Sequence, residues 1–76
     1  MKGQTVCFSH PLELELELSK KLLTAVFAEA GYFTSKAEEC DIYVCFEGEN
    51  GARLKSAQAR NSKIVLAEAF AEYLGV

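Results

Sequence analysis

A near-continuous apolar run in the middle of the chain restricts the fold more than any other feature. Residues Asp41-Ile42-Tyr43-Val44-Cys45-Phe46 carry no charge after Asp41 and are mostly β-branched or aromatic. Such a run is typical of a central strand covered on both faces, because a half-exposed strand alternates apolar and polar residues. A chain of 76 residues, half of them apolar, is long enough for one hydrophobic core. We therefore expect a single domain over residues 1–76, with helices on both faces of a sheet.

The segments around this run predict an alternation of short strands and helices. Three further strands are expected, the last of them buried, at Gln4–Phe8, Tyr32–Thr34 and Lys63–Leu66. Three helices are expected, one between an N-cap at Ser19 and a stop at Gly31, and two at Ala52–Arg60 and Ala67–Leu74. Residues 35–40 are expected to be a polar connection. The order β-α-β-β-α-β-α predicts an α/β fold with a mostly parallel sheet.

The segment Leu12–Leu18 gives two conflicting signals. Leucine and glutamate alternate strictly along it, and a period of two predicts a half-buried strand. Both residue types, however, favour helix over strand. We expect a loop here, with room for a short extra strand.

Composition limits the environment and the partners of the chain. No apolar run approaches the roughly 20 residues that span a bilayer, and the N-terminal residues have no signal-peptide pattern. We therefore expect a soluble, cytoplasmic domain with no membrane association. The formal net charge is −3, whereas proteins that bind DNA non-specifically are usually basic. Any nucleic-acid contact must use a local patch.

The cysteines are expected to be structural. The chain has three cysteines, Cys7, Cys40 and Cys45, so they cannot all pair in disulfides within the chain. None of them belongs to a Cys-x-x-Cys motif. With only His10 to add, their spacing fits no standard zinc site. We expect buried free thiols that pack as small apolar groups, and we expect no metal and no cofactor.

Several motifs together resemble a BRCT domain. The most specific is the run Gly51–Arg60, which is similar to the "G-S-K-L-x-K-A-Q" helix in the BRCT domains of bacterial NAD-dependent DNA ligases. The first strand ends in a hydroxyl residue (Thr5–Ser9), the first helix ends in Ala30-Gly31 near the family's Gly-Gly pair, and Cys40–Val44 is similar to the family's "T-D-hydrophobic-L-V" strand. Ile64-Val65 followed by Glu68–Phe70 is similar to the family's last strand and helix. The chain departs from the pattern at His10, where a glycine is common.

The resemblance implies a four-stranded parallel sheet flanked by three helices, and no enzymatic activity. It implies a module of DNA repair or replication that binds phosphopeptides, phosphate-bearing DNA ends or other BRCT domains. The family's phosphate-binding positions correspond to Ser9, His10 and Arg53. Arg53 would lie in the first turn of a helix, where free N–H groups and the helix dipole favour an anion. Glu47 and Glu49, in the preceding loop, would repel that anion unless they point away.

Several alternatives stay open. Ser9 could cap a strand end, His10 could be an exposed residue before proline, and Arg53 could be a solvated helix residue. With Arg53, the cations Lys55, Arg60 and Lys63 either form a patch for a DNA backbone or make up an ordinary solvated face.

The functional alternatives come from two other classes. One is a purely structural domain that binds another protein or dimerises, so a homodimer stays open. The other is a phosphocysteine carrier that uses Cys7, but such carriers need a loop of Gly, Ser and Thr after the cysteine. The loop here has no glycine. The sequence thus favours a non-catalytic interaction module that binds a protein partner, a phosphopeptide or a 5′-phosphorylated DNA end.

Overall fold

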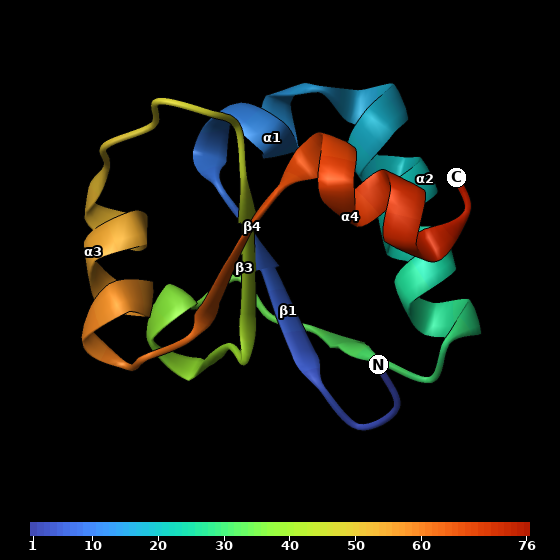
Figure 1. Ribbon diagram of the computed structural model, residues 1–76, viewed down its shortest axis with the longest axis horizontal. Coiled ribbons are helices and arrows are strands. Elements are labelled where there is room, and N and C mark those ends of the chain that lie inside the picture. Colours follow the sequence, from blue (N-terminus) through green and yellow to red (C-terminus); the bar gives the residue numbers. More distant parts are fainter.

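The computed structural model describes residues 1–76 and consists of one four-stranded sheet between helices (Figure 1). The elements, in chain order, are β1 (Thr5–Phe8), α1 (His10–Leu14), α2 (Leu16–Ala28), β2 (Tyr32–Phe33), the 3₁₀ helix η1 (Ala37–Glu39), β3 (Ile42–Cys45), α3 (Ala52–Ala59), β4 (Lys63–Leu66) and α4 (Ala67–Leu74). The strands lie in the order β2-β1-β3-β4, and every neighbouring pair is parallel. The expected α/β fold with a four-stranded parallel sheet is confirmed.

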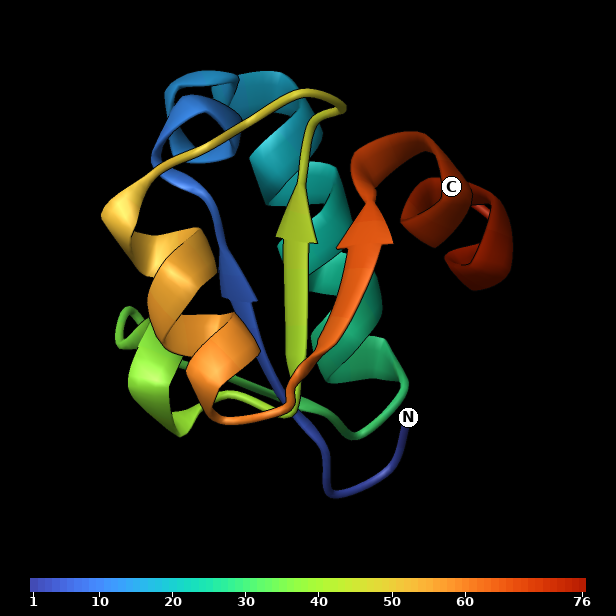
Figure 2. The ribbon, with the colours of Figure 1, turned by 60° about the vertical axis from the view of Figure 1, so that its left-hand side comes forward.

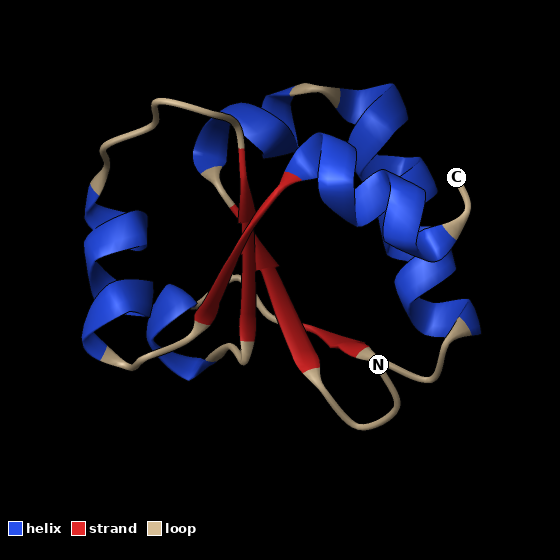
Figure 3. Cartoon of the chain, viewed as in Figure 1, coloured by secondary structure: helices blue, strands red, loops and turns tan.

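The helices divide between the two faces of the sheet, as Figure 3 shows with the sheet seen edge-on. One face is covered by α1, α2 and α4, and the other by α3 and η1. Each face has its own apolar cluster, because side chains alternate across a strand. The larger cluster, of nine buried residues, includes Phe8, Val44 and Phe70. The smaller one, of six, includes all three cysteines and Tyr43. All four residues of β3 are buried, as the apolar run predicts for a strand covered on both sides.

The expectation of a loop over Leu12–Leu18 is wrong, because the segment is helical. It forms the end of α1 and the start of α2, which meet at Glu15. Leu12 is fully buried, while Leu14 and Leu16 are 68 % and 70 % exposed. The leucines therefore share no common face, as they would in a strand. Helix propensity outweighs the two-residue period here, and the chain has four α-helices where three were expected.

The starts of these two helices also differ from expectation. Ser9, not Ser19, is the side-chain N-cap: its hydroxyl accepts a hydrogen bond from the Leu12 N–H, and Pro11 occupies the first turn. Ser19 lies inside α2, where its hydroxyl donates to the carbonyl of Leu16. The proline that ends the first strand thus also opens a helix.

Gly31 follows α2 for a reason other than backbone conformation. The left-handed residue after this helix is Ala30, with φ of 59°. A Cβ on Gly31 would lie 2.8 Å from the Met1 sulfur and 3.0 Å from a Val26 methyl. A side chain here would therefore have to displace the flexible Met1 side chain and would press on Val26, so the position favours glycine.

The strand β4 is exposed, which corrects the expectation of a buried strand. Lys63, Ile64 and Leu66 are exposed and only Val65 is half-buried. The reason is its place at the edge of the sheet, where it pairs with β3 alone. Figure 2 shows α3 lying across the β1 side of its face, which leaves β4 uncovered.

Smaller differences concern element ends. The strand β2 has two residues, α3 ends one residue early at Ala59, and the connection before β3 contains η1. The longest helix, α2, has 13 residues, and no helix qualifies as a membrane span.

Candidate functional site

Two of the residues that the resemblance assigns to phosphate binding, Ser9 and Arg53, meet at one edge of the sheet. Ser9 follows β1, and Arg53 lies in the first turn of α3 after the loop that leaves β3. Because all strands are parallel, these segments leave the sheet at the same, carboxyl edge. The strands β2 and β3 lie on opposite sides of β1, so the connections from β1 and β2 run in opposite directions along the sheet. Ligands in open α/β sheets bind at such a switch point, which here lies between β1 and β3. We refer to Ser9, Arg53, Glu13 and Glu49 as the switch-point cluster.

Ser9 is fully buried and all its hydrogen-bonding groups are in use. Its main-chain N–H donates to the carbonyl of Val44, at 2.9 Å. Its hydroxyl accepts from the Leu12 N–H at 3.3 Å and donates to Oε2 of Glu49 at 2.8 Å. Ser9 therefore starts α1 and at the same time holds a carboxylate from a loop 40 residues away in sequence.

Glu49 ties the loop between β3 and α3 to the end of β1. The oxygen that accepts from Ser9 also accepts from the main-chain N–H of Phe46. Gly48, between them, has φ of 80°, a conformation that allows the loop to fold back. Two donors thus converge on one carboxylate oxygen at the place where an anionic ligand was predicted.

Arg53 is also held by groups of the chain itself. Its guanidinium forms an ion pair with Glu13 in α1 and donates to the carbonyl of Phe8 at 3.2 Å. The hydrogen bond to Glu13 is the largest of the effects that raise the pKa of Arg53. The side chains of Arg53 and Glu13 are both about one-third exposed, at 36 % and 34 %. The pair fastens α3 to α1 across the carboxyl edge.

The other predicted site residues lie outside this cluster. The imidazole of His10 is exposed at the start of α1 and makes no hydrogen bond or ion pair. Lys55 is exposed on α3. Arg60 lies at the far end of α3, where it donates to the carbonyl of Cys40 and pairs with Asp41. Since α3 is about 12 Å long, Arg53 and Arg60 lie at opposite edges of the sheet, and Lys63 lies on β4. The four cations do not gather at one spot.

The cysteines are free and buried. Burial raises the pKa of Cys7 to about 11, and neighbouring Cys40 adds to the rise. Burial likewise raises the pKa of Cys40 and of Cys45. No three His, Cys, Asp or Glu side chains are placed so that they could hold a metal ion.

The sequence left two features of the cluster unrecognised. Glu13 was assigned no partner, because it lies in the alternating segment expected to be a loop. Glu13 lies one turn after Ser9 and faces α3 only when the segment is helical. Glu49 was recognised as an acid near the expected phosphate, but its direction depends on the fold of the loop, which sequence spacing does not fix. No protein-family model, curated protein or solved structure matches the chain.

Proposed function

We propose that this chain is a non-catalytic interaction module of DNA repair or replication, and that its ligand is a protein partner bound without phosphate. The association with DNA repair and replication rests on the resemblance to BRCT domains. In support, the motif Gly51–Arg60 forms the N-cap, helix and C-cap of α3, and Thr5–Phe8 forms a central strand. The choice of a protein partner rests on the switch-point cluster.

One observation carries that choice: two of the three residues that the resemblance assigns to phosphate binding already contact a carboxylate. Ser9 donates its hydroxyl hydrogen to Glu49, and Arg53 pairs with Glu13. A phosphate at about 4 Å from either carboxylate would be repelled by about 4 kcal/mol at the effective dielectric constant of a protein surface. A charge-assisted hydrogen bond contributes about 1.5–3 kcal/mol. The guanidinium of Arg53 would attract the phosphate by a similar amount, but Glu13 already balances its charge. Glu49 then leaves the switch-point cluster net negative, so the cluster as a whole repels a phosphate.

A phosphate-bearing ligand is the second candidate. The observation that favours it is the position of Ser9 and Arg53 at the carboxyl edge, where β1 and β3 diverge. A phosphopeptide or a 5′-phosphorylated DNA end would bind here only if Glu13 and Glu49 swung away. This candidate therefore requires a rearrangement of the loop before α3.

The phosphocysteine carrier gains no support. Cys7 is fully buried within β1, and its raised pKa keeps the thiol protonated. Nucleophilic cysteines are partly exposed and have lowered pKa values.

A titration of the isotope-labelled chain, followed by NMR, separates the first two candidates. The probes are a phosphoserine peptide mixture and a 5′-phosphorylated DNA duplex, each beside its unphosphorylated control. We expect no phosphate-dependent shift at Ser9, His10 or Arg53 in the unmodified chain. A variant with both Glu13→Gln and Glu49→Gln should gain such shifts, and adding Arg53→Ala should remove them. Phosphate-dependent shifts in the unmodified chain would favour the second candidate instead.

Cross-linking in cell extract tests the proposed partner class. The chain, carrying a photo-reactive group at exposed Lys55, is irradiated in extract with and without phosphatase treatment. We expect cross-links to replication or repair proteins that survive the phosphatase. Cross-links that vanish after phosphatase, or that involve no protein of this class, would contradict the proposal.

A further inference from the structure

The open edge of the sheet along β4 has free main-chain groups. Lys63 donates its N–H to the carbonyl of Asp41, at 2.9 Å. In a parallel pair, alternate residues turn both main-chain groups toward the neighbouring strand. The main-chain groups of Lys63 and Val65 therefore face β3. Both main-chain groups of Ile64 and the N–H of Leu66 face outward, whereas the carbonyl of Leu66, the N-cap of α4, accepts the first hydrogen bond of that helix. An edge of this kind is a template for another strand.

The side chains beside this edge are apolar on both faces of the sheet. Ile64 and Leu66 are in register with Tyr43 and Cys45, which places them on the α3 face. They are 38 % and 42 % exposed. On the opposite face, Val65 lies in register with Val44 of the larger cluster.

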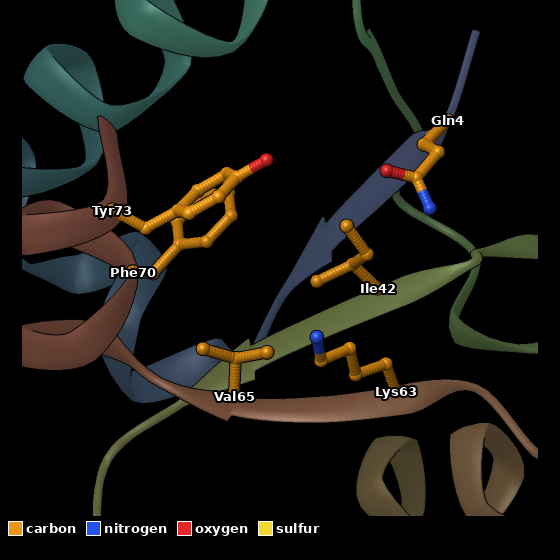
Figure 4. Close-up of a pocket in the computed structure, with 6 residues that line it drawn as sticks. All are labelled: Gln4, Ile42, Lys63, Val65, Phe70 and Tyr73. Carbon is orange, nitrogen blue, oxygen red and sulfur yellow. The ribbon is translucent and has the colours of Figure 1, made fainter. Parts of the chain in front are cut away.

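A hollow adjoins the edge on the α4 face. Figure 4 shows Val65 and Lys63 of β4 beside it, with Phe70 and Tyr73 of α4 across from them. Its volume is about 200 Å³, and Ile42 and Gln4 complete its lining. Tyr73 is 65 % exposed. Apolar surface thus continues from the strand edge onto the neighbouring helix.

The charges at the two ends of β4 are complementary and unused. Lys63 begins the strand, and Glu68 follows its end in the first turn of α4. Both are exposed, and neither belongs to an ion pair of the chain. A copy of the strand laid antiparallel brings Lys63 toward Glu68 of that copy, whereas a parallel copy brings Lys63 against Lys63.

We propose that two copies of this chain associate by antiparallel pairing of β4 with β4 about a twofold axis at Val65. In this register Ile64 pairs with Leu66 of the second copy and Leu66 with its Ile64, so the exposed side chains cover one another. Lys63 lies opposite Ala67, next to Glu68, of the second copy. Such self-complementarity is what a twofold interface requires. The two sheets become one continuous sheet, and the hollows of both copies lie beside the axis.

This inference goes beyond the proposed function and does not rest on it, because the second copy supplies the only partner. The interface is small, so we expect a dissociation constant of roughly 0.1–1 mM.

The direct test uses the purified chain alone. Sedimentation equilibrium up to roughly 1 mM, near the expected dissociation constant, should show a mass rising toward twice that of the chain. A mixture of isotope-labelled and unlabelled chain should give intermolecular NOEs between Ile64 and Leu66. A mass that stays at one chain overturns the proposal. So does a dimer whose NOEs come from exposed apolar side chains away from this edge, such as Leu14, Leu16 and Phe27.

Charge reversal tests the register. Lys63→Glu and Glu68→Lys should each weaken association about two- to five-fold, since a rim charge pair contributes little. The double variant should recover the original affinity. Lys55→Glu on exposed α3 is the matched control and should change nothing, with circular dichroism showing that every variant folds. A double variant no tighter than the single ones overturns the antiparallel register.

Discussion

Glu49 is a residue whose role depends wholly on its surroundings. As a loop glutamate it would be solvated, but here it accepts hydrogen bonds from Ser9 and from the N–H of Phe46. It thereby joins the loop before α3 to the end of β1. The contacts of Glu49 therefore hold two parts of the fold together.

Replacing Glu49 should destabilise the domain. In Glu49→Ala, the hydroxyl of Ser9 and the N–H of Phe46 lose their acceptor, and a buried unpaired donor reduces stability by about 1–3 kcal/mol. Glu47→Ala, at an exposed position of the same loop, should stay within about 0.5 kcal/mol. Urea unfolding measures both, and equal values would show that the contact of Glu49 contributes nothing.

Alkaline pH should destabilise the domain through its buried thiols. The folded pKa of Cys7, about 11, lies above its ordinary value of 9.0, so folding favours the protonated thiol. This contribution is complete below pH 9.0 and is lost as pH rises through about 11. For Cys7 it amounts to about 2–3 kcal/mol. The raised pKa values of Cys40, Cys45 and Tyr43 act in the same direction.

Urea unfolding across this pH range measures the effect, with Cys7→Ala as the comparison. The variant should lose less stability than the unmodified chain between neutral and alkaline pH. If the two lose stability in parallel, the thiol of Cys7 is not responsible.

At the scale of elements, α1 and α2 show how a sequence pattern misleads. A strand over Leu12–Leu18 would place all the leucines on one face. Leu12 alone is buried, because Ser9 and Pro11 start a helix that turns Leu14 and Leu16 outward. The starting signal lies in these two residues before the alternation, and it decides the structure of the residues that follow.

Single alanine substitutions distinguish the two structures of this segment. Leu12→Ala should reduce stability by about 2–5 kcal/mol, since it leaves a cavity in the core. Leu14→Ala and Leu16→Ala should stay within about 0.5 kcal/mol. Thermal or urea unfolding gives all three values. Similar losses for all three leucines would indicate the strand.

The sequence predicted the fold wherever one residue pattern decided the structure. The run Asp41–Phe46 required burial on both faces, so β3 and the parallel sheet followed from it. The edge position of β4 did not follow, because its apolar residues Ile64, Val65 and Leu66 are those of a buried strand. Strand order depends on pairing between segments far apart in the sequence, and no local sequence pattern predicts it.

The sequence placed Ser9 and Arg53 near each other, but it did not predict which groups they contact. Ser9 and Arg53 do lie at one edge of the sheet. Their occupation by Glu49 and Glu13 depends on side-chain directions in two segments, the loop before α3 and the alternating segment. Neither direction can be worked out before the backbone is known.

At the scale of the whole molecule, Phe70 is the largest side chain that α4 adds to the larger cluster. Phe70 is buried against the sheet, while Tyr73, on the same helix, is largely exposed. A domain of this size has a total stability of roughly 4–11 kcal/mol at typical values per residue. The loss of one large core side chain is therefore a substantial part of the whole.

Phe70→Ala should bring the domain close to unfolding. The expected loss is about 3–5 kcal/mol, which should appear as a large fall in melting temperature. Tyr73→Ala is the matched control and should change the melting temperature of dilute, monomeric protein only slightly. A comparable fall for both variants would place Tyr73 in the core as well.

The strand order also bears on biosynthesis. The strand β1 lies in the middle of the sheet. Its neighbour β2 follows at Tyr32–Phe33, and its other neighbour β3 begins 36 residues after Val6, at Ile42. Phe70, which completes the larger cluster, comes later still. During synthesis β1 therefore keeps one apolar, unpaired edge until β3 has been made. Long-range parallel pairing is slow, and such segments are the ones that chaperones protect.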